Sequence, residues 1–133
     1  MHVVLLVERD LQDNRFLKKH CIRKSKDFDS NFRKGQKLVT PTLIFRVLPN
    51  DQGHCRLGMA VPKKVGNAVM RNLIKRRIRE AFRNTKDIFK THVDIVVSPR
   101  RGIQERQFQD YLSSFEFLAK KTRGISEGRG INE

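Results

Sequence analysis

The chain has 133 residues, the size of one domain, and 38% of them are hydrophobic. Lys and Arg number 29 against 14 Asp and Glu, so the formal net charge is +15. This balance argues against a fully disordered chain, a membrane protein and an enzyme built around a large cavity. It favours one compact domain with a polyanionic partner, because fixed positive charges attract phosphates and release their counterions. An acidic membrane surface is the other polyanion to consider, and binding to it usually requires an amphipathic anchor.

The N-terminal region and the cysteines favour a cytoplasmic protein. The apolar run at residues 3–7 is too short for a secretory signal or a membrane span. Cys21 and Cys55 show neither CxxC spacing nor a disulfide framework, so a reducing compartment is expected. Each cysteine follows a histidine, which raises zinc binding as an alternative. Neighbouring residues on a strand point to opposite faces, however, and such pairs chelate poorly.

The first predicted elements are a helix and a strand. Ser25 is a suitable N-cap for the helix and Gly35 a suitable stop, with Phe28 and Phe32 one turn apart. Residues 42–48 then form an extended run rich in β-branched and aromatic side chains, which predicts a strand.

A second strand is predicted over about residues 55–61, after turn-forming residues at 49–53, so the two strands are interpreted as a hairpin. Leu57 and its apolar neighbours alternate in this strand with small or basic residues such as Gly58 and Ala60. The small residues leave room on one face of the sheet. Either a chain or ligand lies close to that face, or a helix packs against it.

The remaining elements are a helix, a strand and a helix. Asn67 is a suitable N-cap for a long helix over about residues 68–84, residues 93–97 predict a strand, and the last helix is expected over about 104–122. The fold class is therefore α+β, three helices on a small sheet in the order helix, hairpin, helix, strand, helix. The expected organisation is a flexible N-terminal extension at 1–13, a single domain at 14–122 and a flexible C-terminal tail at 123–133.

The long helix and the loop before it concentrate positive charge. Between Lys63 and Arg83 there are eight basic residues and one acid, Glu80. A helical wheel places an apolar stripe opposite a basic one. The apolar stripe comprises Met70, Ile74, Ile78 and Ala81. The opposite stripe comprises Asn72, Lys75, Arg76, Arg79 and Arg83, with Arg71 and Arg77 beside it.

Such a charge run is ordinarily a solvated helix face, but here the acids that would pair with the cations are nearly missing. The like charges repel one another, which favours a surface that binds nucleic acid. Arginine suits bidentate recognition of phosphate, and the helix N-terminus after Gly66 adds unpaired amides.

Residues 65–79, VGNAVMRNLIKRRIR, closely resemble the signature of the bacterial ribonuclease P protein component, the RNR motif. The similarity continues through Lys63 and Lys64 and through residues 80–82, and more loosely to residues 25–35 and 56–58. It covers about residues 14–122. The spacing of Ala, Arg-Asn, Lys-Arg and Arg on one helix makes the signature specific.

The resemblance implies a protein subunit of the ribonucleoprotein that cuts the 5′ leader from precursor tRNA. In that family the catalytic centre and its Mg2+ ions belong to the RNA subunit, so this chain is expected to supply no catalytic residue, no metal site and no strongly bound cofactor. The implied partners are ribonuclease P RNA and precursor tRNA, with no membrane and no obligate protein partner. The implied fold is a small mixed sheet with three helices in the order α-β-β-(β)-α-β-α. It contains a left-handed βαβ crossover, against the usual right-handed preference.

The resemblance also assigns two sets of RNA-contacting residues. Those implied to bind the RNA subunit are Lys63, Lys64, Asn67, Arg71, Asn72, Lys75, Arg76, Arg79 and Arg83. Those implied to line a cleft for the single-stranded leader are Phe28, Phe32, Arg46 and Arg56. For each phenylalanine, packing in the core is the alternative to stacking on bases. Arg46 departs from the family, which often carries an aromatic residue there, so a cation and its stem would meet the leader.

No residue pattern predicts a nuclease centre within the chain. Asp27 and Asp29 lie two apart on a helix, point about 200° apart and cannot share an ion. Gly53 and Gly58 have the spacing of a phosphate-binding loop, but the two residues that follow are not the required Lys and Ser or Thr. The chain is thus expected to bind and position RNA. The alternatives are a ribosomal or general RNA-binding structural protein and, third, a DNA-binding transcription factor, for which helix-turn-helix spacing is missing.

Overall fold

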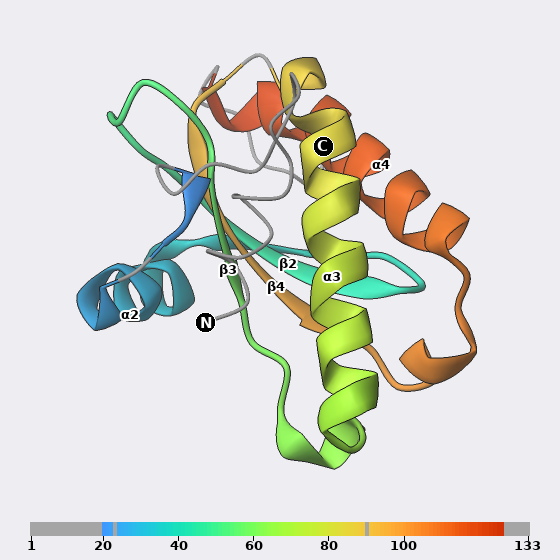
Figure 1. Ribbon diagram of the computed structural model, residues 1–133. Coiled ribbons are helices and arrows are strands. Elements are labelled where there is room, and N and C mark those ends of the chain that lie inside the picture. Colours follow the sequence, from blue (N-terminus) through green and yellow to red (C-terminus); the bar gives the residue numbers. More distant parts are fainter. Residues whose placement is uncertain (1–19, 23, 90, 127–133) are drawn as a thin grey trace.

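The computed structural model describes residues 20–22, 24–89 and 91–126, which form one sheet and three helices (Figure 1). In chain order the elements are α2 (Ser25–Lys34), β1 (Gln36–Val39), β2 (Leu43–Pro49), β3 (Arg56–Met59), α3 (Ala68–Thr85), β4 (Val93–Pro99) and α4 (Phe108–Ser126). Three short 3-10 turns lie in the connections: η2 (Lys63–Val65), η3 (Lys86–Ile88) and η4 (Ile103–Glu105). The predicted α+β class is confirmed. The predicted extension at residues 1–13 lies outside the described residues.

The sheet has the strand order β1-β2-β4-β3. β2 pairs antiparallel with both β1 and β4, whereas β3 pairs with β4 in parallel. The predicted hairpin between residues 42–48 and 55–61 is therefore wrong, because β4 lies between those two strands. The hairpin is instead formed by β1 and β2, in which Leu38 faces Phe45. β1 has four residues and one buried side chain, so its alternation is too short for the sequence to predict a strand there.

The parallel pair β3 and β4 is joined through α3, since parallel neighbours need a crossover connection. In Figure 1, α3 lies in front of the sheet, both strands run downward, and β4 lies to the right of β3 at their lower ends. The crossover is therefore left-handed, as the resemblance implied.

The hydrophobic core lies between one face of the sheet and the helices α3 and α4. Leu43, Phe45 and Val47 alternate along β2 and are fully buried on this face. The Phe45 ring meets Phe115 of α4 at a centroid distance of 5.1 Å. The predicted apolar stripe of α3 is confirmed, because Ile74, Ile78 and Ala81 are buried and Met70 is half-buried against the core.

Helix α2 packs on the other face of the sheet. It begins after Lys24, which makes no side-chain cap, so the prediction of Ser25 as the N-cap is wrong. Gly35 ends the helix as predicted, its amide bonding to the Asn31 carbonyl. The Phe28 ring lies directly over Gly58, where a Cβ atom would approach Phe28 Cζ to 2.7 Å. The open face at Gly58 is therefore covered by a helix, which was one of the two alternatives.

Helix α4 differs from its predicted bounds at both ends. Residues 103–105 form the separate turn η4, and the helix begins at Phe108. It continues to Ser126, so the first residues of the predicted tail are helical, while residues 127–133 lie outside the described part of the chain. Tyr111, Phe115, Leu118 and Ala119 are buried, which confirms that the apolar stripe of this helix belongs to the core.

Two buried groups that can lose a proton, the thiol of Cys55 and the phenol of Tyr111, predict that the protein becomes less stable at alkaline pH. Burial raises the pKa of the Cys55 thiol above its ordinary 9.0 and the pKa of the Tyr111 phenol above its ordinary 10.0. The unfolded chain loses these protons first, so the free energy of unfolding should decrease as the pH rises through about 9 to 10. Urea unfolding at pH 8 and pH 10 under reducing conditions tests this. Cys55→Ala should show a shallower decrease than the wild type; equal slopes would contradict the role of Cys55.

Candidate nucleic-acid interface

The start of α3 is a well-defined helix terminus with two lysines in front of it. Asn67 caps the helix as predicted, its Oδ1 accepting a hydrogen bond from the Met70 amide at 2.9 Å. The Arg71 Nε donates to the Gly66 carbonyl at 3.1 Å, which holds the preceding loop against the helix. Lys63 and Lys64, on η2, are exposed. Positive side chains and unpaired amides therefore gather at this end of α3, an arrangement that suits phosphate.

The predicted RNA-binding residues differ in exposure. Lys63, Lys64, Asn67, Asn72 and Arg76 are exposed, whereas Arg71, Lys75 and Arg83 are half-buried and Arg79 is buried. We call Lys63, Lys64, Asn72, Lys75 and Arg76 the basic face. It occupies the loop before α3 and the first half of the helix.

The prediction that Arg79 projects from the solvent-facing stripe is wrong. Only 4% of Arg79 is exposed, and its Nε has no hydrogen-bond partner among the described residues. Burial lowers the pKa of its guanidinium. Arg79 is buried because the segment at residues 20–22 packs beside it. Cys21 pairs with Leu57 of β3 and lies near Arg79, and the His20 ring meets Phe82 of α3 at a centroid distance of 6.2 Å. A helical wheel carries no information about such a neighbouring segment.

Two further cations of α3 have internal partners. The Arg83 Nη2 lies 2.7 Å from Glu80 Oε2. The Arg77 Nη1 donates to the Arg106 carbonyl at 2.9 Å, and its guanidinium lies over the Tyr111 ring. The positive surface of the helix is therefore narrower than the count of basic residues suggested, and it is concentrated toward the N-terminus.

The structure adds two arginines that the sequence interpretation missed. Arg100 and Arg101 are exposed and follow β4, while Lys63 and Lys64 follow β3. Because β3 and β4 are parallel, their carboxyl ends lie at the same edge of the sheet. The Gln104 side chain donates to the Val65 carbonyl and joins the two loops. The sequence contained one signal for this site, the pair Arg100 and Arg101 shortly after the strand predicted over residues 93–97.

The predicted cleft residues Phe32 and Arg46 lie together on the α2 side of the sheet. Phe32 is 43% exposed, and the Arg46 guanidinium lies 5.2 Å from its ring centroid. Lys37, exposed on β1, is the cross-strand partner of Arg46. Phe28, by contrast, is half-buried against Gly58. An exposed ring under a guanidinium is thus available to a ligand at Phe32, whereas Phe28 anchors the helix.

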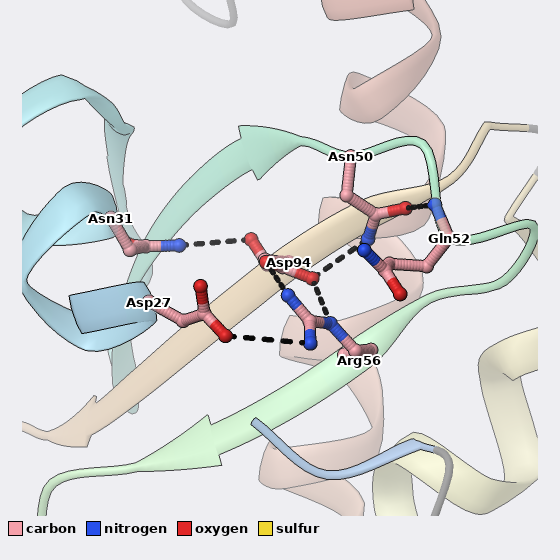
Figure 2. Close-up of polar contacts among 6 residues, drawn as sticks. All are labelled: Asp27, Asn31, Asn50, Gln52, Arg56 and Asp94. Carbon is pink, nitrogen blue, oxygen red and sulfur yellow. Dashed lines mark hydrogen bonds and ion pairs between the residues drawn. The ribbon is translucent and has the colours of Figure 1, made fainter. Parts of the chain in front are cut away.

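Arg56 is bound to two carboxylates (Figure 2). Its Nε lies 2.8 Å from Asp94 Oδ1, its Nη2 lies 2.6 Å from Asp94 Oδ2, and its Nη1 lies 3.6 Å from Asp27 Oδ2. The hydrogen bonds to Asp94 raise the pKa of Arg56 further, so this side chain stays charged. Contact between Arg56 and the leader stays a prediction, and its guanidinium already has an internal role.

Among the residues that the structure describes there is neither a candidate metal centre nor a candidate membrane span. The His20 and His54 rings meet edge to face at 5.4 Å, yet nowhere in the described ranges do three His, Cys, Asp or Glu side chains gather to hold a metal ion. Among the described helices, none combines the length and the apolar character needed to cross a membrane.

A mixed four-stranded sheet, a basic helix in a left-handed crossover and an exposed aromatic–cation pair define a small RNA-binding protein of the α+β class. The family model described as Ribonuclease P matches residues 16–123. The chain therefore belongs to the ribonuclease P protein family.

Individual relatives agree with this assignment. The ribonuclease P protein component of Streptococcus pneumoniae (strain Hungary19A-6) is 34% identical over 109 residues, which cover 82% of this chain and 89% of that protein. The Staphylococcus aureus RNase P protein superposes with a TM-score of 0.67 at 33% identity, covering 76% of this chain and 93% of the other. The RNase P protein from Thermotoga maritima superposes with a TM-score of 0.70 at 31% identity, covering 76% of this chain and 96% of the other. The alternative of an RNA-binding structural protein without a processing role is not favoured.

Proposed function

We propose that this chain is the protein subunit of a ribonuclease P holoenzyme, an endoribonuclease that removes the 5′ leader from precursor tRNA. In this proposal the basic face binds ribonuclease P RNA, and the surface around Phe32 and Arg46 binds the single-stranded leader. The observation that carries the proposal is the exposed basic face at the start of α3, in a chain that matches the family over nearly its whole domain.

The basic face acts through electrostatics. Lys63 and Lys64 are exposed cations at the positive end of the α3 dipole, and Arg76 is an exposed cation about two turns further along the helix. Contact with RNA phosphates releases condensed counterions, so binding weakens as salt increases. Neutralised phosphates repel one another less, so the protein stabilises the folded RNA and lowers its requirement for Mg2+.

The surface around Phe32 and Arg46 supplies contacts that suit single-stranded RNA. An exposed aromatic ring stacks on a base whatever the base is, and a guanidinium above the ring adds a charge for the phosphates. Lys37 adds a second cation on the neighbouring strand. Such a surface favours precursor tRNA over mature tRNA, because only the precursor carries a leader.

We place the catalytic centre and its Mg2+ in the RNA subunit. Asp27 and Asp94, the carboxylates near the proposed leader surface, are directed at Arg56 and balance its charge. The protein therefore contributes binding and orientation. A cytoplasmic location fits the two reduced cysteines, Cys21 and Cys55.

Phe32→Ala tests the leader surface. In holoenzyme reconstituted with a bacterial ribonuclease P RNA, we expect it to weaken binding of precursor tRNA by roughly 1–3 kcal/mol, the value of one stacked base, and to leave mature tRNA binding unchanged. Phe117→Ala is a matched control, since Phe117 is also 43% exposed and lies under Lys121 on α4. Equal losses for precursor and mature tRNA, or equal effects of the two variants, would contradict the proposal.

A further inference from the structure

A buried polar cluster joins the sheet to α2 and has no assigned role. Its centre is Asp94 of β4, which is only 5% exposed. Its Oδ1 accepts hydrogen bonds from Arg56 Nε at 2.8 Å and from Asn50 Nδ2 at 2.7 Å, and its Oδ2 accepts from Arg56 Nη2 at 2.6 Å (Figure 2). A bidentate arginine–carboxylate pair has a defined geometry, so Asp94 fixes the plane and direction of the Arg56 guanidinium.

Two contacts run from this cluster to α2. The Arg56 Nη1 lies 3.6 Å from Asp27 Oδ2, in the first turn of the helix. One turn later the fully buried Asn31 donates from Nδ2 to the Asp94 main-chain carbonyl at 3.0 Å (Figure 2). Asp27 and Asn31 are four residues apart and so lie on one side of α2.

The aromatic residues of α2 are adjacent to these two contacts. Phe28 follows Asp27 and Phe32 follows Asn31, so the rotation of α2 that satisfies the polar contacts also sets the position of both rings. α2 has ten residues and no side-chain N-cap, and so short a helix depends on tertiary contacts for its position.

We propose that Asp94 is a positioning residue for leader recognition. Through Arg56 it holds α2 at the rotation that places Phe32 beneath Arg46, without touching RNA itself. The inference rests on the proposed leader surface. In this inference a residue of β4 controls the preference for precursor tRNA over mature tRNA, whereas α3 binds the RNA subunit.

The test is Asp94→Asn in the reconstituted holoenzyme, because asparagine keeps the shape and removes the charge that orients Arg56. We expect the ratio of precursor to mature tRNA affinity to fall about threefold to tenfold, while affinity for the RNA subunit changes less than about twofold. Asn50→Ala is the matched control. It removes another donor to the same carboxylate, but one from the β2–β3 connection, so the ratio should stay at the wild-type value.

A double-variant cycle tests whether Asp94 acts through Arg56. Asp94→Asn combined with Arg56→Gln should lower the ratio no more than either change alone. If Asp94→Asn does not fold by circular dichroism, Asp27→Asn takes its place as the test. It removes the charge of the last contact in the series Asp94–Arg56–Asp27, on a side chain that is partly exposed. A lowered ratio in Asp27→Asn supports the proposal, and a wild-type ratio overturns it.

Failure of the inference is distinguishable from failure of the proposed function. A wild-type ratio in a folded Asp94→Asn protein, while Phe32→Ala lowers the ratio, overturns the role of Asp94 alone. Equal losses of RNA-subunit and precursor affinity in Asp94→Asn would show a merely structural role and also overturn it. A wild-type holoenzyme without preference for precursor tRNA would refute the leader surface itself.

Discussion

Simultaneous replacement of Lys63, Lys64 and Arg76 by alanine is expected to weaken binding of ribonuclease P RNA by roughly 100-fold to 1,000-fold at moderate salt. All three side chains are exposed at the start or the outer side of α3. Each lost phosphate contact also removes about one released counterion, so the dependence of log K on log salt should become shallower by about two to three. The fold should persist, since none of the three belongs to the core.

A filter-binding titration over several salt concentrations measures both quantities. The matched control is Lys24→Ala with Lys26→Ala and Lys120→Ala, which removes the same charge from exposed positions on other elements. We expect the control to retain most of the affinity and of the salt dependence. If the two triple variants behave alike, binding depends on net charge rather than on the basic face.

Gly58→Val is expected to lower the free energy of unfolding by about 1–3 kcal/mol and to abolish the preference for precursor tRNA. Even a Cβ atom at this position would lie 2.7 Å from Phe28 Cζ and 3.4 Å from Ile22 Cβ. The valine must therefore displace the Phe28 ring, and α2 moves with it. The Phe32 ring then loses its place beneath Arg46.

Urea unfolding of a double-variant cycle with Phe28→Ala identifies the cause. Phe28→Ala removes the ring that the valine would strike, so the double variant should be less destabilised than the sum of the single variants. Strictly additive losses would show that Gly58 is needed for some reason other than its contact with Phe28.

Most local features of the fold were predictable from sequence, the Ser25 cap being an exception, whereas the strand partners were not. Asn67 as a cap and the Ile74–Ile78 stripe depend on residues within a few turns of one another. The pairing of β3 depends on where α3 returns the chain, and β4 then separates β3 from β2. A hairpin between consecutive strands was the simplest interpretation, and only the crossover rules it out.

The same distinction holds for the candidate site. The wheel places Arg76 on the outside correctly, because nothing else packs there. It fails for Arg79, since the segment at residues 20–22 lies beside that part of α3. The partner of Arg56 is Asp94, 38 residues later in the chain, and the position of Arg100 near the lysine loop follows from parallel pairing. These contacts join residues that are far apart in the sequence, so no local pattern predicts them.

We propose that this chain binds and positions RNA for a reaction catalysed by another molecule. The most direct test is cleavage of precursor tRNA at low Mg2+ with the protein, a bacterial ribonuclease P RNA, or both. We expect release of the 5′ leader by the mixture, little cleavage by the RNA alone and none by the protein alone. Cleavage by the protein alone, or a mixture no more active than the RNA, would contradict it.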